Sequence, residues 1–247
     1  MKSGKKADYD YIHGIFLEEC KNRFLCKVKI NNREELCYQS SSSKLGHFID
    51  LPGREVVLVE NAGKNSKTKY TLHAVKTNSG YILLNLGYVN KLLLKEFAKP
   101  DSLYNASGQM YCEKKVADTL KADFFFDGTE RTIVEAKGII SEAQVAYLPS
   151  MEVDRAVAQL SLFSNLLSDG YFVHYYVVLM NPEIETLRLD SNREEYYRLF
   201  RLCLSRGLEF FLYKVVWHQG KPALIRDSQG ETVFLSNAVV NEDFMAR

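Results

Sequence analysis

The sequence lacks a charge excess and an apolar run long enough to cross a membrane. Its 32 lysines and arginines are balanced by 31 acidic residues, for a net charge of +1. The whole-chain basic excess of many nucleic-acid-binding domains is therefore absent, although a basic face can coexist with an acidic one. The longest apolar run covers residues 171–180 and is interrupted by His174, so it is too short for a transmembrane helix.

The cysteines are few and scattered. They stand at positions 20, 26, 37, 112 and 203, and none belongs to a C-x-x-C pair. Their odd number and spacing argue against a disulfide framework and against a thiolate zinc site. The chain begins Met-Lys-Ser-Gly-Lys-Lys-Ala-Asp with no apolar segment after it, so no signal peptide is evident. We therefore expect a cytoplasmic protein with no membrane partner.

Short strands dominate the first part of the chain. Residues 24–30 alternate apolar and polar side chains, and further strands are expected over 34–39, 55–60, 70–76 and 81–86. A helical periodicity follows only at 88–98. Short strands that follow one another so closely along the sequence predict a small β-barrel, and their number fits a five-stranded oligonucleotide-binding (OB) barrel. We assign residues 1–100 to this domain; at 247 residues, the chain has room for a second.

Lysines occur on the expected barrel where a phosphate backbone could bind. They lie on its first alternating strand and in its loops, at Lys27, Lys29, Lys44, Lys64 and Lys67. Such residues suit a nucleic-acid backbone. They would equally keep exposed strands soluble, and the sequence leaves both interpretations open.

The second part of the chain, residues 101–247, has an α/β pattern. A strand is expected over 109–116, and a hairpin follows whose strands cover 122–126 and 131–137. An amphipathic helix over 151–167, an apolar strand over 172–180, a helix over 192–205 and a strand over 209–216 come next. A C-terminal hairpin is expected from 223–226 and 232–235.

The hairpin carries the residues most suited to chemistry. Asp123 lies on its first strand, while Glu135 and Lys137 are two residues apart on the second and so share a face. Two carboxylates and the Ala136 carbonyl could hold Mg²⁺ or Mn²⁺, because hard cations prefer oxygen ligands. Lys137 could then orient or deprotonate a water, and Glu113 could assist from the neighbouring strand. The alternative is a surface ladder of salt bridges.

These residues resemble the PD-(D/E)xK, or restriction-endonuclease-like, nuclease superfamily. More closely, the chain is similar to the sugar fermentation stimulation protein A family over about residues 20–215. The segments and single residues that agree with the family pattern, in the same order along the chain, are Arg23-Phe24-Leu25, Leu51-Pro52-Gly53, Leu84 to Leu94, Glu113, Ala122-Asp123-Phe124, Val134-Glu135-Ala136-Lys137, Leu148-Pro149, Arg155, Leu160 and Gly207. The resemblance implies an N-terminal OB-like barrel followed by a PD-(D/E)xK domain, with DNA binding and nuclease activity.

The chain departs from the family's usual pattern at three places. Residues 37–46 replace a His-Cys-Pro-Asn-Thr-Gly-like loop, residues 148–151 replace Phe-Pro-Asp-Ala, and Gln159 stands where a histidine is usual. The superfamily often has a glutamine on this helix facing the site, so Gln159 is a candidate catalytic residue. Arg155, one turn earlier, would face the same way and could bind a phosphate.

Two functions of different classes follow. The first is a metal-dependent nuclease acting on DNA, with RNA as an alternative substrate. The second is a non-catalytic nucleic-acid-binding or regulatory protein of the sugar fermentation stimulation type. A complete Asp/Glu/Lys set favours the first, and the altered loops favour the second. A superfamily nuclease that cuts both strands often works as a dimer, so a homodimer is also considered.

Overall fold

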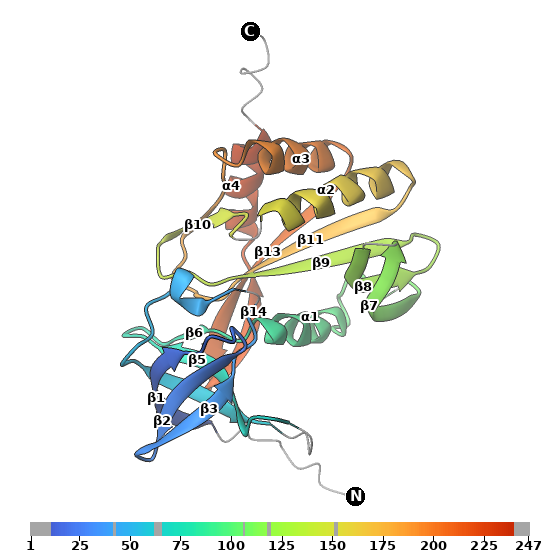
Figure 1. Cartoon of the computed structure of the whole chain (residues 1–247). Helices are drawn as coiled ribbons and strands as arrows, with labels where there is room; N and C mark the ends of the chain where they lie inside the picture. The colour runs from blue at the N-terminus through green and yellow to red at the C-terminus, as the bar shows by residue number, and fades with distance from the viewer. Residues whose placement is uncertain are drawn as a thin grey trace, which may run out of the picture. The chain divides into compact units, whose positions relative to one another are not determined.

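The computed structural model describes residues 11–41, 43–61, 66–105, 107–117, 120–150 and 153–239 (Figure 1). The chain divides into two compact units, which meet in the sequence between Gly87 and Tyr88. A short 3₁₀ helix, η2 (Leu86–Tyr88), crosses this boundary. In the described part of the chain, no helix is both long enough and apolar enough to span a bilayer.

The first unit is an OB barrel closed by its first five strands, as the strand pattern predicts, and a short sixth strand pairs with the fifth. Its elements are β1 (Ile12–Glu19), β2 (Leu25–Ile30), β3 (Arg33–Tyr38), η1 (Leu45–His47), β4 (Glu55–Glu60), β5 (Tyr70–Lys76) and β6 (Tyr81–Leu83). The sheet order is β3-β2-β1-β4-β5-β6, and a parallel pairing between β3 and β5 closes the barrel. Closure removes the unpaired edges that an open sheet of this size would expose.

Local sequence explains how the barrel turns and curves. Asn31 and Asn32 have φ values of 48° and 63°, the left-handed pair of a tight hairpin between β2 and β3. Gly14 on β1 has room for no side chain, since an added Cβ would lie 2.6 Å from Val28 Cγ1. The alternation of β2 is confirmed: Cys26 and Val28 are fully buried, while the lysines between and after them face outward.

The second unit is a mixed α/β domain built on a six-stranded sheet. Its strands are β7 (Gln109–Ala117), β8 (Leu120–Asp127), β9 (Thr132–Ile139), β11 (Phe172–Leu179), β13 (Glu209–His218) and β14 (Lys221–Arg226), in the order β14-β13-β11-β9-β8-β7. β9, β11 and β13 are parallel, and the outer strands are antiparallel. Two short strands, β10 (Val145–Leu148) and β12 (Thr186–Leu189), pair separately.

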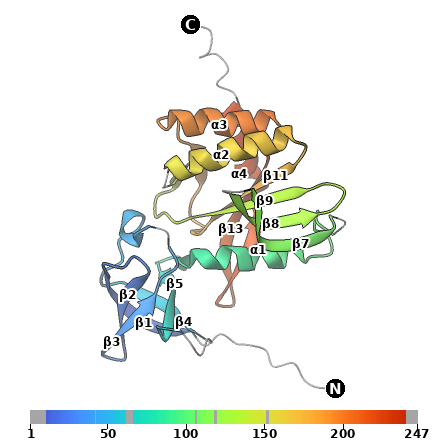
Figure 2. The ribbon, with the colours of Figure 1, turned by 45° about the vertical axis from the view of Figure 1, so that its right-hand side comes forward.

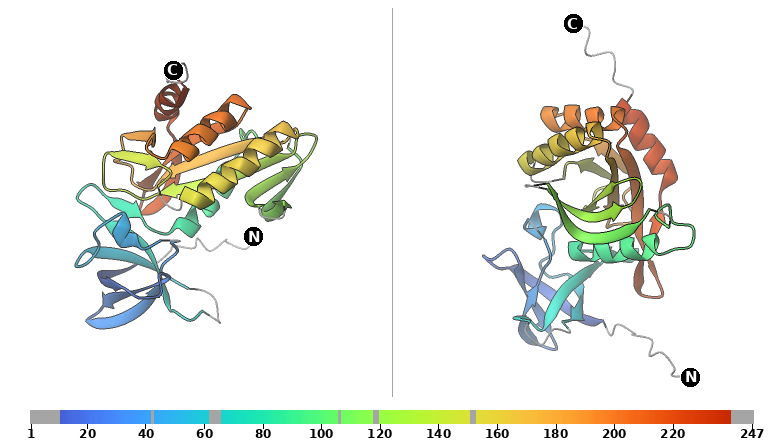
Figure 3. Two further views of the ribbon diagram at one scale, coloured as in Figure 1. Left: turned by 45° about the horizontal axis from the view of Figure 1, so that its top comes forward. Right: turned by 90° about the vertical axis from the view of Figure 1, so that its right-hand side faces the viewer.

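Helices cover both faces of this sheet. Figures 2 and 3 show α2 (Val153–Ser168) and α3 (Glu194–Ser205) on one face and α1 (Val89–Phe97) on the other. The apolar run of β11 is therefore buried on both sides, as predicted for a central strand. Phe97 explains why α1 belongs to this unit, because its ring packs edge-on against Phe124 and Tyr176 of the sheet. We expected α1 to end the first domain, with a boundary near residue 100.

The prediction of a C-terminal hairpin is only partly confirmed. β14 does form a hairpin, but its partner is β13, and residues 232–235 lie within a helix, α4 (Ser228–Val239). The Asp227 side chain accepts a hydrogen bond from the Gly230 amide at 3.0 Å and so caps this helix. Phe234 and Ala238, four residues apart, are both buried, and the Phe234 ring stacks on Phe210 at 4.3 Å. A spacing of four residues shares one face in a strand as well as in a helix, so the Asp227 cap, and not this spacing, marks the start of α4.

Candidate metal centre

The site lies where two strands of the hairpin separate. The register between β8 and β9 ends at the pair Phe124 and Val134. Beyond it, the Asp123 carboxylate replaces a ladder bond, because its Oδ2 accepts a hydrogen bond from the Ala136 amide at 2.9 Å. Its Oδ1 accepts a second bond from Asn90 Nδ2 on α1, at 3.1 Å. Asp123 is thus held in the opening between the strands by partners on two other elements.

Glu135 and Lys137 form the second part of the site. The Glu135 carboxylate is buried, and Lys137 Nζ lies 2.5 Å from its Oε1. Lys137 also donates to Gln159 Oε1 on α2, at 3.0 Å. The ammonium group is therefore fixed between β9 and α2 while its side chain stays 34 % exposed. The positive charge of Lys137 is therefore both oriented and accessible to a ligand.

Burial controls the protonation of Glu135. Loss of hydration raises the pKa of its carboxyl group, the Lys137 ammonium lowers it, and the neighbouring Asp123 charge raises it again. The net direction is upward, since removal of a carboxylate from water disfavours the charged form. Two acids beside one lysine leave an excess of negative charge here. When both acids are ionised, a divalent cation would more than offset that excess.

The oxygen atoms available suit a hard divalent cation. Asp123 and Glu135 offer carboxylates, and a backbone carbonyl is at hand. The N–H and C=O of one strand residue point toward the same neighbouring strand, so the Ala136 carbonyl faces the side on which its amide meets Asp123. No group of three or more His, Cys, Asp or Glu side chains with metal-ligating geometry occurs in the described residues. The donor set thus fits Mg²⁺ or Mn²⁺, which keep several waters, better than a caged ion.

Glu113 is placed differently from the sequence-based expectation. It lies on β7 between the pairs that flank Asp123, but with a φ of 52° in an irregular stretch of the strand. Its carboxylate lies 2.6 Å from Lys121 Nζ, and both side chains are more than 60 % exposed. This geometry favours a charge on a strand edge, which was the alternative for this residue.

Of the two helix residues, Gln159 contacts the hairpin through its hydrogen bond with Lys137. Arg155 lies four residues earlier on α2 and is exposed. Asn90 was missed by sequence reasoning, because a single asparagine in an amphipathic helix has no distinctive spacing. Only the packing of α1 against the sheet shows its role.

The lysines proposed for nucleic-acid binding differ in their surroundings. Lys27 is neutralised by ion pairs with Glu18 at 2.8 Å and Glu34 at 3.2 Å. Lys29, Lys44 and Lys67 are exposed, and Lys64 lies outside the described residues.

The loop that departs from the family pattern is organised by one carboxylate. Glu19, at the end of β1, accepts hydrogen bonds from the Leu45 amide at 2.7 Å and the Gly46 amide at 3.0 Å. Gln39 Nε2 donates to the same carboxylate at 2.8 Å and to the Arg23 carbonyl at 2.7 Å. Gln39, Leu45 and Gly46 of this loop are therefore tied to β1 of the barrel despite the loop's altered sequence.

Comparisons with known proteins agree on both units. Residues 88–221 match the model described as "Sugar fermentation stimulation protein RE domain", and residues 19–84 match "SfsA N-terminal OB domain". A sugar fermentation stimulation protein homolog from Desulfitobacterium hafniense (strain Y51) is 28 % identical over 173 residues, covering 69 % of this chain and 74 % of its own. One from Saccharolobus solfataricus is 29 % identical over 209 residues, covering 83 % and 80 %.

A solved structure has the same fold. It is described as "The structure of Pyrococcus Furiosus SfsA in complex with Ca2+" and superposes with a TM-score of 0.69 at 19 % identity. The match covers 92 % of this chain and 96 % of that one, so both units and their order along the chain are shared.

Proposed function

Because the chain belongs to the sugar fermentation stimulation protein family, we propose that its second unit is a divalent-metal-dependent nuclease, acting on DNA or RNA phosphodiester bonds. The observation that carries this proposal is the buried Glu135 carboxylate, bonded to Lys137 and adjacent to Asp123. A buried acid with a raised pKa, beside a second acid and an oriented ammonium group, is typical of a catalytic site. A surface ladder of salt bridges would not require such burial.

Each residue has a distinct proposed role. Asp123, Glu135 and the Ala136 carbonyl would hold Mg²⁺ or Mn²⁺, and the bound ion would neutralise phosphate charge and activate a water. Lys137 would orient that water and stabilise the charge that develops on the phosphate. Gln159 fixes the Lys137 side chain through a 3.0 Å hydrogen bond. We assign no direct role to Glu113, given its exposed pairing with Lys121.

A divalent cation in this family is supported by the Pyrococcus protein, whose structure is of a complex with Ca²⁺. Ca²⁺ and Mg²⁺ share a preference for oxygen ligands, although Ca²⁺ takes more of them. The same hard-ion chemistry agrees with the carboxylate and carbonyl oxygens gathered around Asp123 and Glu135 in this chain.

The experiment is a cleavage assay with matched variants. The full-length protein is incubated with single- and double-stranded DNA and RNA in Mg²⁺, Mn²⁺ or EDTA. We expect metal-dependent cleavage that is abolished in Lys137→Ala and in Glu135→Gln and kept in Glu113→Gln, an exposed acid of the same hairpin region. Absence of cleavage in every metal, or its persistence in both site variants, would refute the proposal.

A second candidate function is nucleic-acid binding without turnover. It is favoured by one observation: the described residues supply only two carboxylate side chains to the centre, without a third His, Cys, Asp or Glu. This function predicts binding of nucleic acid in EDTA and in Mg²⁺ alike, with intact substrate recovered after long incubation. The cleavage assay with electrophoresis of the bound material separates the two.

A further inference from the structure

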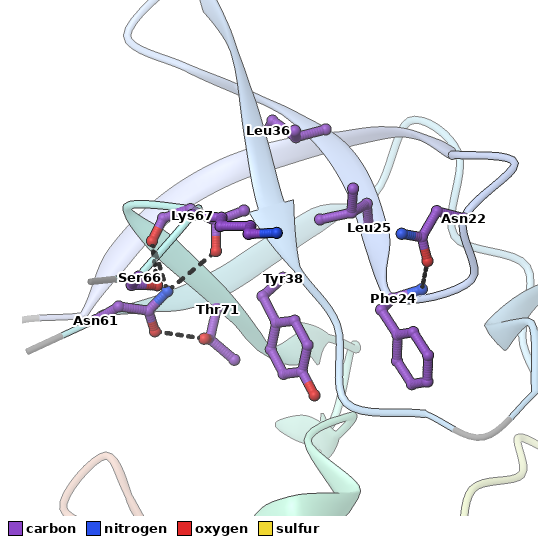
Figure 4. Close-up of a pocket in the computed structure, with 10 residues that line it drawn as sticks. Asn22, Phe24, Leu25, Leu36, Tyr38, Asn61, Ser66, Lys67 and Thr71 are labelled. Carbon is purple, nitrogen blue, oxygen red and sulfur yellow. Dashed lines mark hydrogen bonds between the residues drawn. The ribbon is translucent and has the colours of Figure 1, made fainter. Parts of the chain in front are cut away.

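The barrel of the first unit has a groove of about 710 Å³ that is distinct from the metal centre (Figure 4). One wall comes from β2, β3 and the residues just before β2 and is largely apolar; the other comes from Asn61, residues 66–68 and Thr71 of β5 and is polar. The residues used below are Phe24, Leu36 and Tyr38 on the first wall and Asn61, Lys67 and Thr71 on the second.

The apolar wall exposes flat rings. Phe24 and Tyr38 are 39 % and 38 % exposed, and Leu36 beside them is 46 % exposed. The two rings are nearly parallel, with centroids 6.4 Å apart and planes inclined by 10°. A cluster of half-exposed apolar side chains on one face of a small barrel marks a binding surface. Aromatic rings in such a cluster suit a ligand that is itself flat.

Hydrogen bonds and strand pairing fix the backbone that carries the two rings. The Phe24 amide donates to Asn22 Oδ1 at 3.1 Å, and the Phe24 carbonyl accepts from the Gln39 amide at 2.9 Å. Tyr38 is the strand partner of Leu25 in the β2–β3 ladder. Little backbone entropy would thus be lost on binding, because the platform exists before the ligand arrives.

The polar wall is also ordered, and it carries positive charge. Thr71 donates to Asn61 Oδ1 at 2.5 Å, and Asn61 Nδ2 donates to the Thr68 carbonyl at 2.9 Å, which fixes the wall. Lys67 is exposed on this wall and forms no ion pair with another of the described residues. The Arg23 guanidinium lies 5.0 Å from the Phe24 ring centroid. Cations close to exposed rings match a ligand with flat faces and an anionic backbone.

We propose that this groove binds unpaired bases of a single-stranded nucleic acid, with Phe24 and Tyr38 as stacking residues and Lys67 facing the phosphates. The inference deepens the proposed nuclease function and rests on it for the substrate class. Only a single strand presents free base faces to protein rings, since a duplex buries them in its own stack. Single-stranded DNA and RNA share this chemistry. Cleavage of a single strand breaks one phosphodiester bond, whereas cleavage of both strands of a duplex breaks two. One active site per chain therefore suffices for a single strand.

The test measures binding separately from cleavage. Fluorescence anisotropy is recorded in EDTA with labelled single strands of deoxythymidine or uridine about twelve nucleotides long, within the span of OB-fold sites, and with a DNA duplex of equal length. We expect Phe24→Ala and Tyr38→Ala each to weaken single-strand binding by about 5-fold to 150-fold, the usual range for one stacked base. Comparison of the two single strands shows whether the sugar matters.

Two variants serve as controls. Tyr38→Phe keeps the ring and should bind within about twofold of wild type. Ile15→Ala removes a 38 %-exposed apolar side chain from β1, outside the groove lining, and should also bind normally. Lys67→Ala should reduce the slope of log affinity against log salt by about 0.7 for a single strand. Melting curves of all variants confirm that the barrel is folded.

The outcomes distinguish this inference from the proposed nuclease. If the ring variants lose single-strand binding but no variant or metal yields cleavage, the groove stands and the nuclease proposal fails. The groove assignment is overturned if Phe24→Ala and Tyr38→Ala bind single strands as wild type does, or if duplex binding falls equally. It is also overturned if wild type is a dimer in light scattering and Tyr38→Ala is a monomer, because a second copy then covers the rings.

Discussion

Replacing Glu135 by glutamine should change the stability of the protein in opposite directions with and without a divalent cation. Burial raises the pKa of the Glu135 carboxyl group in the folded protein. An acid of this kind binds its proton more tightly when folded than when unfolded, so stability falls as the pH rises above its unfolded pKa. At neutral pH, the Glu135 carboxyl group therefore makes the metal-free protein less stable than it is at low pH, where this group is protonated in both states.

The size of the metal-free effect follows from the surroundings of the pair. Glutamine has nearly the same shape, and the Lys137 side chain left behind is 34 % exposed and can be hydrated. Replacing both members of a buried ion pair by neutral groups is neutral or stabilising by about 1–4 kcal/mol, whereas removing one member is destabilising when the other charge stays buried. Because Lys137 is partly exposed, its charge can be hydrated in Glu135→Gln. We therefore expect the variant to raise the free energy of unfolding of the metal-free protein by between zero and about 2 kcal/mol. That corresponds to a rise in Tm of at most about 8 °C for a chain of this size.

Addition of a cation should reverse the order. At a concentration one hundred times its Kd, a ligand that binds only the folded state stabilises it by about 2.7 kcal/mol. For wild type this is a rise in Tm of about 5–11 °C. Glu135→Gln has lost one of two anionic ligands and should show little of this rise. The stability conferred by the metal would then exceed the intrinsic advantage of the variant.

Thermal unfolding at neutral pH, in EDTA and across Mg²⁺ and Mn²⁺ titrations, measures both effects. Glu113→Gln is the matched control, because it removes an exposed acid and should keep the full metal-induced shift. The difference between wild type and Glu135→Gln in EDTA should vanish as the pH falls toward 4.5, the ordinary carboxyl value. An equal Mn²⁺ shift in both proteins would refute the ligand assignment. A metal-free variant that melts well below wild type would refute the burial argument.

Three further predictions concern single side chains. Lys137→Met should lower cleavage by about 10²–10³-fold, as for loss of one charge-stabilising group, while the metal-induced rise in Tm persists; loss of that rise would make Lys137 structural. Asn90→Ala removes one hydrogen bond to Asp123 and should weaken metal binding by about 0.5–1.5 kcal/mol, measured by calorimetric titration; an unchanged affinity would mean that Asp123 needs no positioning. Phe234→Ala should cost about 3–5 kcal/mol in denaturant unfolding, because its ring is fully buried against Phe210; a loss below 1 kcal/mol would contradict the packing of α4.

The sequence by itself determined the elements that have regular periodicity. The alternation in β2, the apolar run of β11 and the hairpin over residues 122–137 are local patterns, and each is found where it was predicted. The barrel followed from the number and spacing of strands. Where periodicity is weak, the sequence-based prediction is wrong. A strand is expected over 232–235, but these residues belong to α4, whose helical character depends on the Asp227 cap and on burial of Phe234.

Sequence order could place Asp123, Glu135 and Lys137 on one hairpin, because a tight turn leaves few registers for the two strands. The partners of these residues come from elsewhere in the chain. Asn90 reaches Asp123 from α1, and Gln159 reaches Lys137 from α2. Such contacts depend on how helices dock on a sheet, which no local pattern encodes. Tertiary structure likewise decided that Glu113 pairs with Lys121 at an exposed edge while Glu135 is buried beside Lys137.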